Sequence, residues 1–308
     1  MGALFPCRRQ READADGGGR TAAGGGALTV RLRPVAFALV GVALVWAWLW
    51  FGVPLLGAIG EGLGNVAAEA LFTLAVYAPI LLAALLLGRL AEVPIGRPDR
   101  AATRRFGGGA VIGSAALALA IGYCGVAGTL FRGTSAFAAS AFAVGLATIT
   151  LQVLAEEAMF RGTIQPLLVN GLGRLAGVAA TAFAFALLHG GAPGIDGVTI
   201  VNMLLGGVVF GALALRGGGI AAAFGAHLAW NAIEQIGVGL DPNPGTGAFG
   251  ALLDLDLAGS VRWGGSDAGL NASLAMTFAL AAAVALILRW GNPRIAPSMP
   301  APPARAGG

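Results

Sequence analysis

The sequence predicts an all-α protein, a polytopic membrane helix bundle of about eight transmembrane helices with both termini in the cytoplasm. Composition gives two reasons: 57% of the 308 residues are hydrophobic and only 11% are charged, whereas about a quarter of the residues of soluble domains are charged. The mean hydropathy of +0.80 agrees with this class. The third reason is that apolar runs of roughly 20 residues, the length a spanning helix needs, recur along the chain.

Eight such runs follow one another, and the connection after the seventh is the longest. The predicted spans are about 35–57, 64–88, 106–127, 136–159, 174–190, 197–215, 218–238 and 270–289. An even number of spans places both termini on one side of the membrane. The connection at about 239–269 is rich in glycine, and we expect it to be irregular.

The two ends of the chain differ in composition from the spans. Residues 1–30 combine glycine, alanine and charged residues and lack the continuous apolar stretch of a signal peptide, so we expect a disordered tail. Residues 293–308 are expected to form a second disordered tail. The transmembrane domain is therefore predicted at 31–292.

Arginine sets the orientation, because arginine near the ends of spans stays in the cytoplasm. The chain has 19 arginines and no lysine, and with the N-terminus inside, 17 of the 19 fall in cytoplasmic segments, leaving Arg132 and Arg262 outside. This uniform arginine preference indicates a genome rich in G and C rather than a basic patch. We therefore expect a multi-pass protein of the bacterial cell (inner) membrane with no nucleic-acid partner.

Ionisable residues inside the spans are the candidates for function, because such groups cost several kcal/mol in hydrocarbon. The candidates are Glu69, Glu156, Glu157, Arg161, His189, His227, Asn231 and Glu234. Helical spacing divides their roles. Glu157 and Arg161 are four residues apart and can neutralise each other, whereas Glu156 is turned about 100° away and is left free of that pair. His227 and Asn231 are also four apart, and Glu234 continues their stripe.

Depth provides a second constraint on Glu156 and His189, which lie on consecutive antiparallel spans. Their midpoint falls at 172 to 173, where Gly171 and Gly173 supply the break that a turn requires. Both residues then lie roughly 25 Å along their helices from this turn. We therefore expect Glu156 and His189 to meet.

One carboxylate, two imidazoles and an amide can together activate water and hold an oxyanion. A glutamate near a histidine can take a proton from water, and histidine and asparagine can donate to the oxygen of a tetrahedral intermediate. The chemistry indicated is hydrolysis of an acyl bond. The segments "EEAMFR", "FALLH" and "HLAWN" match EExxxR, FxxxH and HxxxN, in that order on three successive motif-bearing helices.

These three motifs resemble the CPBP family, the CAAX proteases and bacteriocin-processing proteins, over about residues 135–238. The resemblance implies an intramembrane glutamic endopeptidase similar to type II CAAX prenyl endopeptidases. It implies that Glu156 and His189 activate water, that His227 and Asn231 form the oxyanion hole, and that Glu157 and Arg161 support them. It also implies a mechanism with no cofactor, acting on a membrane-associated protein or peptide that is prenylated at a CAAX tail or carries a leader.

Other interpretations stay open. The two histidines and Glu156 could hold zinc, although HExxH is absent, and Cys7 and Cys124 follow no metal spacing. A proton-coupled transporter would also bury Glu and His, and a scaffold or immunity protein could retain the fold without activity. Glu157 with Arg161 could be a purely structural pair. For Glu234 a solvated interfacial position is favoured over a place in the lining of the substrate cavity, and Glu69 has no assigned role.

Overall fold

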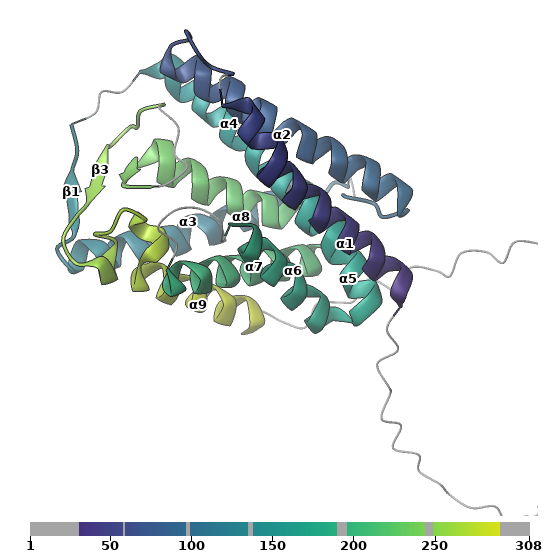
Figure 1. Ribbon diagram of the computed structural model, residues 1–308. Helices are drawn as coiled ribbons and strands as arrows, with labels where there is room; N and C mark the ends of the chain where they lie inside the picture. Colours follow the sequence, from purple (N-terminus) through teal and green to yellow (C-terminus); the bar gives the residue numbers. More distant parts are fainter. Residues whose placement is uncertain are drawn as a thin grey trace, which may run out of the picture.

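The computed structural model describes residues 31–57, 59–96, 99–134, 138–189, 196–243 and 249–289, and every structural statement below concerns these residues. The predicted tails, 1–30 and 293–308, lie outside them. Within them the chain is almost entirely helical (Figure 1). The predicted all-α membrane bundle is confirmed.

The helices follow the predicted order with small shifts at their ends. In the described residues the α-helices are α1 Leu32–Ala47, α2 Asn65–Leu90, α3 Ala102–Val126, α4 Ala139–Glu157, α5 Gln165–Leu172, α6 Arg174–His189, α7 Gly197–Gly217, α8 Ala221–Ala232 and α9 Leu274–Arg289. Short π- and 3-10 segments extend them: η1 Trp48–Gly52, η2 Val53–Leu56, η3 Ala158–Ile164, η4 Ile233–Gly237, η5 Val261–Trp263 and η6 Gly269–Ala272.

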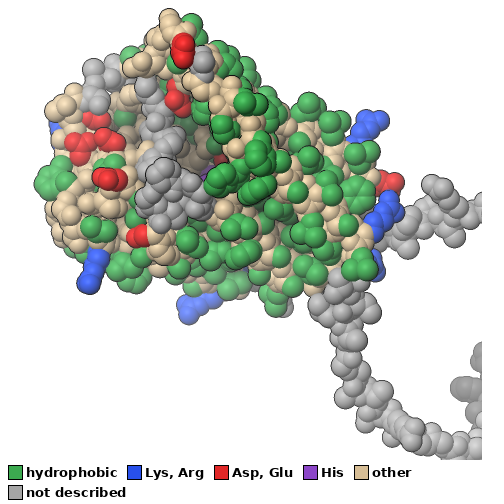
Figure 2. Space-filling model, viewed as in Figure 1, with side chains coloured by type: hydrophobic (Ala, Val, Ile, Leu, Met, Phe, Trp, Pro, Cys, Tyr) green, Lys and Arg blue, Asp and Glu red, His purple; other side chains and the backbone are tan. Residues whose placement is uncertain are grey.

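Five of the helical segments are long and apolar enough to cross a membrane. They are Leu32–Leu56, Asn65–Leu90, Ala102–Val126, Ala139–Leu172 and Gly197–Gly217. The helices α6 and α9 are apolar but shorter. Large hydrophobic side chains cover the outside of the bundle, as Figure 2 shows in green. A surface of this kind belongs in lipid, and the chain is an integral membrane protein.

The fourth helix runs well beyond its predicted span of 136–159. The π-helix η3 joins α4 to α5, so one continuous helical segment extends from Ala139 to Leu172. Pro166 lies in the first turn of α5, and the amide of Gln165 already bonds five residues back to Phe160, the wider spacing of a π-helix. Glu156 therefore lies near the middle of this segment rather than at its end. The turn predicted at Gly171 and Gly173 is confirmed, and Gly173 has φ +85°.

Close packing of α3 on α8 positions one wall of the site. A Cβ added at Gly113 of α3 would lie 2.2 Å from the backbone oxygen of Ala226, so only glycine allows this approach. Ala226 directly precedes His227, which is one of the predicted site residues. The glycine therefore fixes the depth at which α8 presents His227.

The connection after α8 is more ordered than predicted. Strands β1 (Leu130–Arg132), β3 (Leu255–Leu257) and β2 (Leu240–Asp241) form a three-stranded sheet in the order β1-β3-β2. β1 pairs with β3 in antiparallel fashion, and β2 pairs with β3 in parallel fashion. Most of the described residues of the 239–269 connection are irregular as expected, but β2 and β3 are not, because a segment before α4 supplies a strand partner that local composition cannot reveal. The sheet caps the left end of the bundle in Figure 1.

A buried asparagine joins α7 to α9. Nδ2 of Asn202 donates to the carbonyl oxygens of Asn271 and Ser273, both at 2.9 Å, and its Oδ1 accepts from the Thr277 hydroxyl at 2.7 Å. Asn202 is fully buried. Its polar atoms are therefore all used to hold two helices together.

Candidate active site

Four motif residues form one buried chain between α4 with η3 and α8. Oε1 of Glu157 lies 3.1 Å from Nη1 of Arg161 and 2.9 Å from Nδ1 of His227. Nε2 of the same imidazole lies 3.8 Å from Oε2 of Glu156. His227 is thus flanked by two carboxylates, one on each ring nitrogen. The order of the chain is Arg161, Glu157, His227 and Glu156.

Three phenylalanine rings surround the guanidinium of Arg161. Its Cζ lies 4.5 Å from the ring centre of Phe185, 5.3 Å from that of Phe210 and 5.8 Å from that of Phe160. The contact at 3.1 Å to Glu157 lacks the angle of a hydrogen bond, and none of the Arg161 nitrogens has a hydrogen-bond partner in the described chain. Ring faces and one carboxylate therefore balance the charge.

Glu156 lies on a different face of its helix from Glu157 and is only 6% exposed. Its Oε1 accepts from Nε2 of Gln152, one turn earlier on α4, at 3.3 Å. No arginine pairs with this carboxylate in the described residues. Glu156 is consequently a buried anion whose neighbours include a neutral amide and an imidazole.

His189 ends α6, and its Nδ1 lies 2.7 Å from the carbonyl oxygen of Phe185. Because a carbonyl only accepts, Nδ1 carries the proton and Nε2 of a neutral ring is left as an acceptor. The ring of Phe185 lies 4.4 Å from that of His189 and 6.4 Å from that of His227. Within the described chain, His189 and Glu156 make no direct contact. The nearer imidazole to Glu156 is His227.

On His227, too, the hydrogen-bond partner shows that Nδ1 carries a proton. Glu157 can only accept while it is ionised, so Nδ1 of His227 donates to it. The His227 ring also stacks on Phe210, with centroids 4.5 Å apart. Asn231 lies one turn further along α8 and is half-buried. Its amide makes no hydrogen bond in the part of the chain that the structure describes.

The remaining candidates divide differently from expectation. Glu234 is only 4% exposed and accepts from Nε1 of Trp230 at 2.9 Å, so the solvated position expected for it was wrong. A local stripe pattern could not reveal this, because η4 folds the end of α8 inward. Glu69 is half-buried on α2. Motif reasoning also missed Gln152 and the phenylalanine rings, although Phe185 is the first letter of the FxxxH motif.

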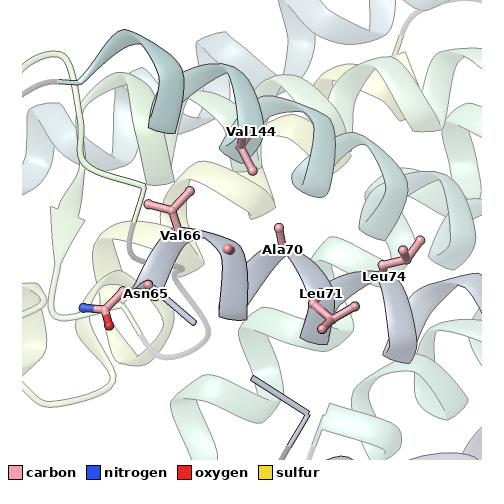
Figure 3. A pocket seen from close by; sticks show the side chains of 8 residues that line it. Asn65, Val66, Ala70, Leu71, Leu74 and Val144 are labelled. Atoms are coloured by element: carbon pink, nitrogen blue, oxygen red, sulfur yellow. The ribbon is translucent and has the colours of Figure 1, made fainter. Parts of the chain in front are cut away.

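The site is reached through a hollow in the surface. Figure 2 shows this hollow, with a histidine side chain visible in its depth. The chain has two histidines, His189 and His227, so the hollow leads to the site. A separate apolar groove of about 860 Å³ lies between the outer halves of α2 and α4, where Val66 and Ala70 point toward Val144 (Figure 3). None of the motif residues lines that groove.

The zinc interpretation needs at least three suitable ligands around one point. In the described chain no group of three His, Cys, Asp or Glu side chains is arranged to hold an ion. One nitrogen of His227 is already bonded to Glu157. The residues present do not fit a zinc site as they stand, and no step below is assigned to a metal.

Comparison with known proteins gives one result. A family described as type II CAAX prenyl endopeptidase Rce1-like matches residues 136–233, the segment that carries Glu156, His189, His227 and Asn231. No curated protein and no solved structure matches the chain. The predicted resemblance to the CAAX proteases is thereby confirmed over this segment, which is similar to the Rce1-like family.

Proposed function

We propose that the protein is an intramembrane endopeptidase that cuts a membrane-associated peptide with water activated by Glu156. The observation that carries this proposal is the buried chain of Arg161, Glu157, His227 and Glu156 within the Rce1-like segment. A carboxylate that has no arginine partner in the described residues, beside an imidazole and below a hollow, is suited to accept a proton from water.

In the first step, Glu156 takes a proton from water while the oxygen of that water attacks the scissile carbonyl. The carbonyl oxygen becomes an oxyanion, and in this mechanism Nε2 of His227 and the amide of Asn231 donate to it. Since Nδ1 of His227 already donates to Glu157, the ring can donate from Nε2 only when it carries both protons. Glu157 thus acts by fixing the orientation of His227.

In the second step, the peptide C–N bond breaks and the proton held by Glu156 passes to the leaving amine. His189, whose Nδ1 bonds to the Phe185 carbonyl, keeps Nε2 as an acceptor and assists proton movement in this mechanism. The substrate class is a membrane-associated peptide, either a CAAX-type tail that is prenylated or a leader segment. The proposed location is the bacterial cell membrane.

The test is cleavage of a panel of prenylated and unmodified membrane peptides by the purified protein. Glu156→Gln keeps the shape of the side chain and removes the base, so cleavage should fall by at least about 10²- to 10⁴-fold, the usual contribution of a general base. Glu61→Gln changes an exposed carboxylate in a loop and is the matched control.

A zinc chelator separates the two mechanisms in the same assay. Cleavage that requires Glu156 and survives the chelator supports the glutamate mechanism. Loss of cleavage on chelation, restored by added zinc, would instead assign His189 and His227 as metal ligands. A folded wild-type protein that cleaves nothing on the panel would support the transporter or scaffold interpretation.

A further inference from the structure

The proposed function draws on α4, α6 and α8, yet α2 also packs beside Glu156. Tyr77 of α2 packs against the hydrophobic cluster that contains Ala155 and Met159, residues that bracket the two glutamates. The chain has two tyrosines, and the other, Tyr123, lies on α3. No motif includes Tyr77.

Two hydrogen bonds fix α2 around the level of Tyr77. Nε1 of Trp48 donates to the carbonyl oxygen of Val76 at 2.9 Å. The hydroxyl of Thr163 donates to the carbonyl oxygen of Ala84 at 3.3 Å. Val76 directly precedes Tyr77, and Thr163 belongs to η3, the π-helix that follows Glu157. The fold therefore sets the position of Tyr77 relative to the glutamate pair from both sides.

Glu156 is poorly supplied with hydrogen-bond donors for a buried carboxylate. Its bond from Gln152 is long, at 3.3 Å, and Nε2 of His227 at 3.8 Å is beyond hydrogen-bond distance. A buried carboxylate that lacks donors is costly. Tyr77 lies close enough to Glu156 for that carboxylate to act on its hydroxyl, and Glu69 acts on the same tyrosine less strongly.

The polar residues of α2 and α4 are arranged in two stripes that reach Glu156. On α2, a polar residue recurs every fourth position, at Asn65, Glu69, Thr73 and Tyr77. On α4 the same spacing gives Thr148, Gln152 and Glu156. Residues four apart share a helix face, and α2 lies along α4 (Figure 1). Tyr77 and Glu156 are the last members of their stripes.

The chemical nature of the donor also matters. Glu157 faces the cation Arg161. Tyr77 and Gln152 are neutral donors, and a neutral donor opposes protonation of a carboxylate less than a cation does. A carboxylate that must accept a proton from water is therefore better oriented by neutral donors than by a cation.

We propose that Tyr77 is a positioning residue of the active site, whose hydroxyl donates to Glu156 and holds that carboxylate toward Nε2 of His227. This inference rests on the proposed function for its effect on cleavage. Its structural content, a direct interaction between Tyr77 and Glu156, can be tested without any cleavage.

The experiment compares Tyr77→Phe with Tyr123→Phe in the full-length protein. Tyr123 is 41% exposed and its ring stacks on Trp263, so its hydroxyl serves as the matched control. Tyr77→Phe should lower kcat by about 10- to 100-fold, as expected for the loss of a hydrogen bond to a charged group, and should leave KM nearly unchanged. Tyr123→Phe should change neither.

A double-mutant cycle on the midpoint of thermal unfolding in detergent gives the second readout. The effects of Tyr77→Phe and Glu156→Ala should be non-additive, because they remove the two ends of one interaction. Tyr123→Phe with Glu156→Ala should be additive. Unchanged kcat in Tyr77→Phe, or an additive Tyr77 cycle, would overturn the inference. If the wild-type protein cleaves no peptide, the proposed function fails and the cycle alone decides on Tyr77.

Discussion

Between α7 and α9 the buried polar groups are neutral and saturated with hydrogen bonds, whereas between α4 and α8 they are charged and leave hydrogen-bonding atoms unused. Asn202 uses both amide hydrogens and its oxygen. In the second region, Oε2 of Glu157 and all three nitrogens of Arg161 have no hydrogen-bond partner in the described residues. Buried polar groups therefore form a complete hydrogen-bond network in the first region and an incomplete one in the second.

The difference separates stability from chemistry. A satisfied neutral network holds helices together at little electrostatic cost. A buried ion pair is weak as a source of stability, because desolvation can exceed the attraction between the charges. The charged region is therefore best explained by what it orients, namely the His227 imidazole and the free carboxylate of Glu156. The predictions below test this division.

The largest effect is expected from Glu157→Ala. The change leaves the buried Arg161 cation and Nδ1 of His227 without their partner, so the free energy of unfolding should fall by about 3–5 kcal/mol. Chemical unfolding in detergent, followed by circular dichroism, measures this. Glu156→Gln is the matched control, because it removes a charge from the adjacent position without unpairing a cation, and it should remain as stable as the wild type.

Two results would contradict this division. Equal destabilisation by Glu157→Ala and Glu156→Gln would mean that both glutamates are structural. A stable Glu157→Ala protein would mean that the phenylalanine rings alone suffice for Arg161. Either result would remove the reason for treating the two adjacent carboxylates differently.

A smaller effect is expected from Asn202→Ala in the neutral network. Three hydrogen bonds are lost at about 0.5–1.5 kcal/mol each, so the free energy of unfolding should fall by about 2–4 kcal/mol. The kcat for peptide cleavage should stay at the wild-type value, measured on the folded fraction. A matching loss of kcat would show that α7 and α9 communicate with the site and that the two networks are not independent.

Much of the bundle was predictable, because hydrophobic run length is a local property. The turn at Gly171 and Gly173 and the order of the helices follow from runs and breaks in the sequence. The pairing partners Glu157 and Arg161 follow from a spacing of four. Motif recognition named the polar residues that line α4, α6 and α8, and a family match now covers the same segment.

The features of the site that the sequence did not predict depend on contacts between segments that are distant in the chain. The approach of His227 to both glutamates requires the depth of α8, which Gly113 on α3 sets. The prediction that Glu156 meets His189 used distance from the turn alone. It could not include the side-chain conformation of His189, whose Nδ1 bonds to the carbonyl of Phe185 one turn earlier on α6. Tyr77 belongs to none of the three motifs, and only its neighbours in the folded structure identify it.

The smallest effect is expected outside both networks, at the start of α7. Oδ1 of Asp196 accepts from the amide and the hydroxyl of Thr199, both at 2.8 Å, and the bond from the amide lowers the pKa of Asp196. Asp196→Ala should cost about 1 kcal/mol of unfolding free energy, the usual value for a helix N-cap.

The contribution of Asp196 should depend on pH. A carboxyl group whose pKa is lower in the folded state stabilises the folded protein fully above its unfolded pKa of about 4. The difference between wild type and Asp196→Ala should therefore shrink as the pH falls through the lowered pKa. Asp196→Asn keeps a capping oxygen without a titrating charge, so its stability relative to Asp196→Ala should be independent of pH. A pH-independent cost of Asp196→Ala would show that the cap acts by geometry alone, as the neutral Asn202 network does.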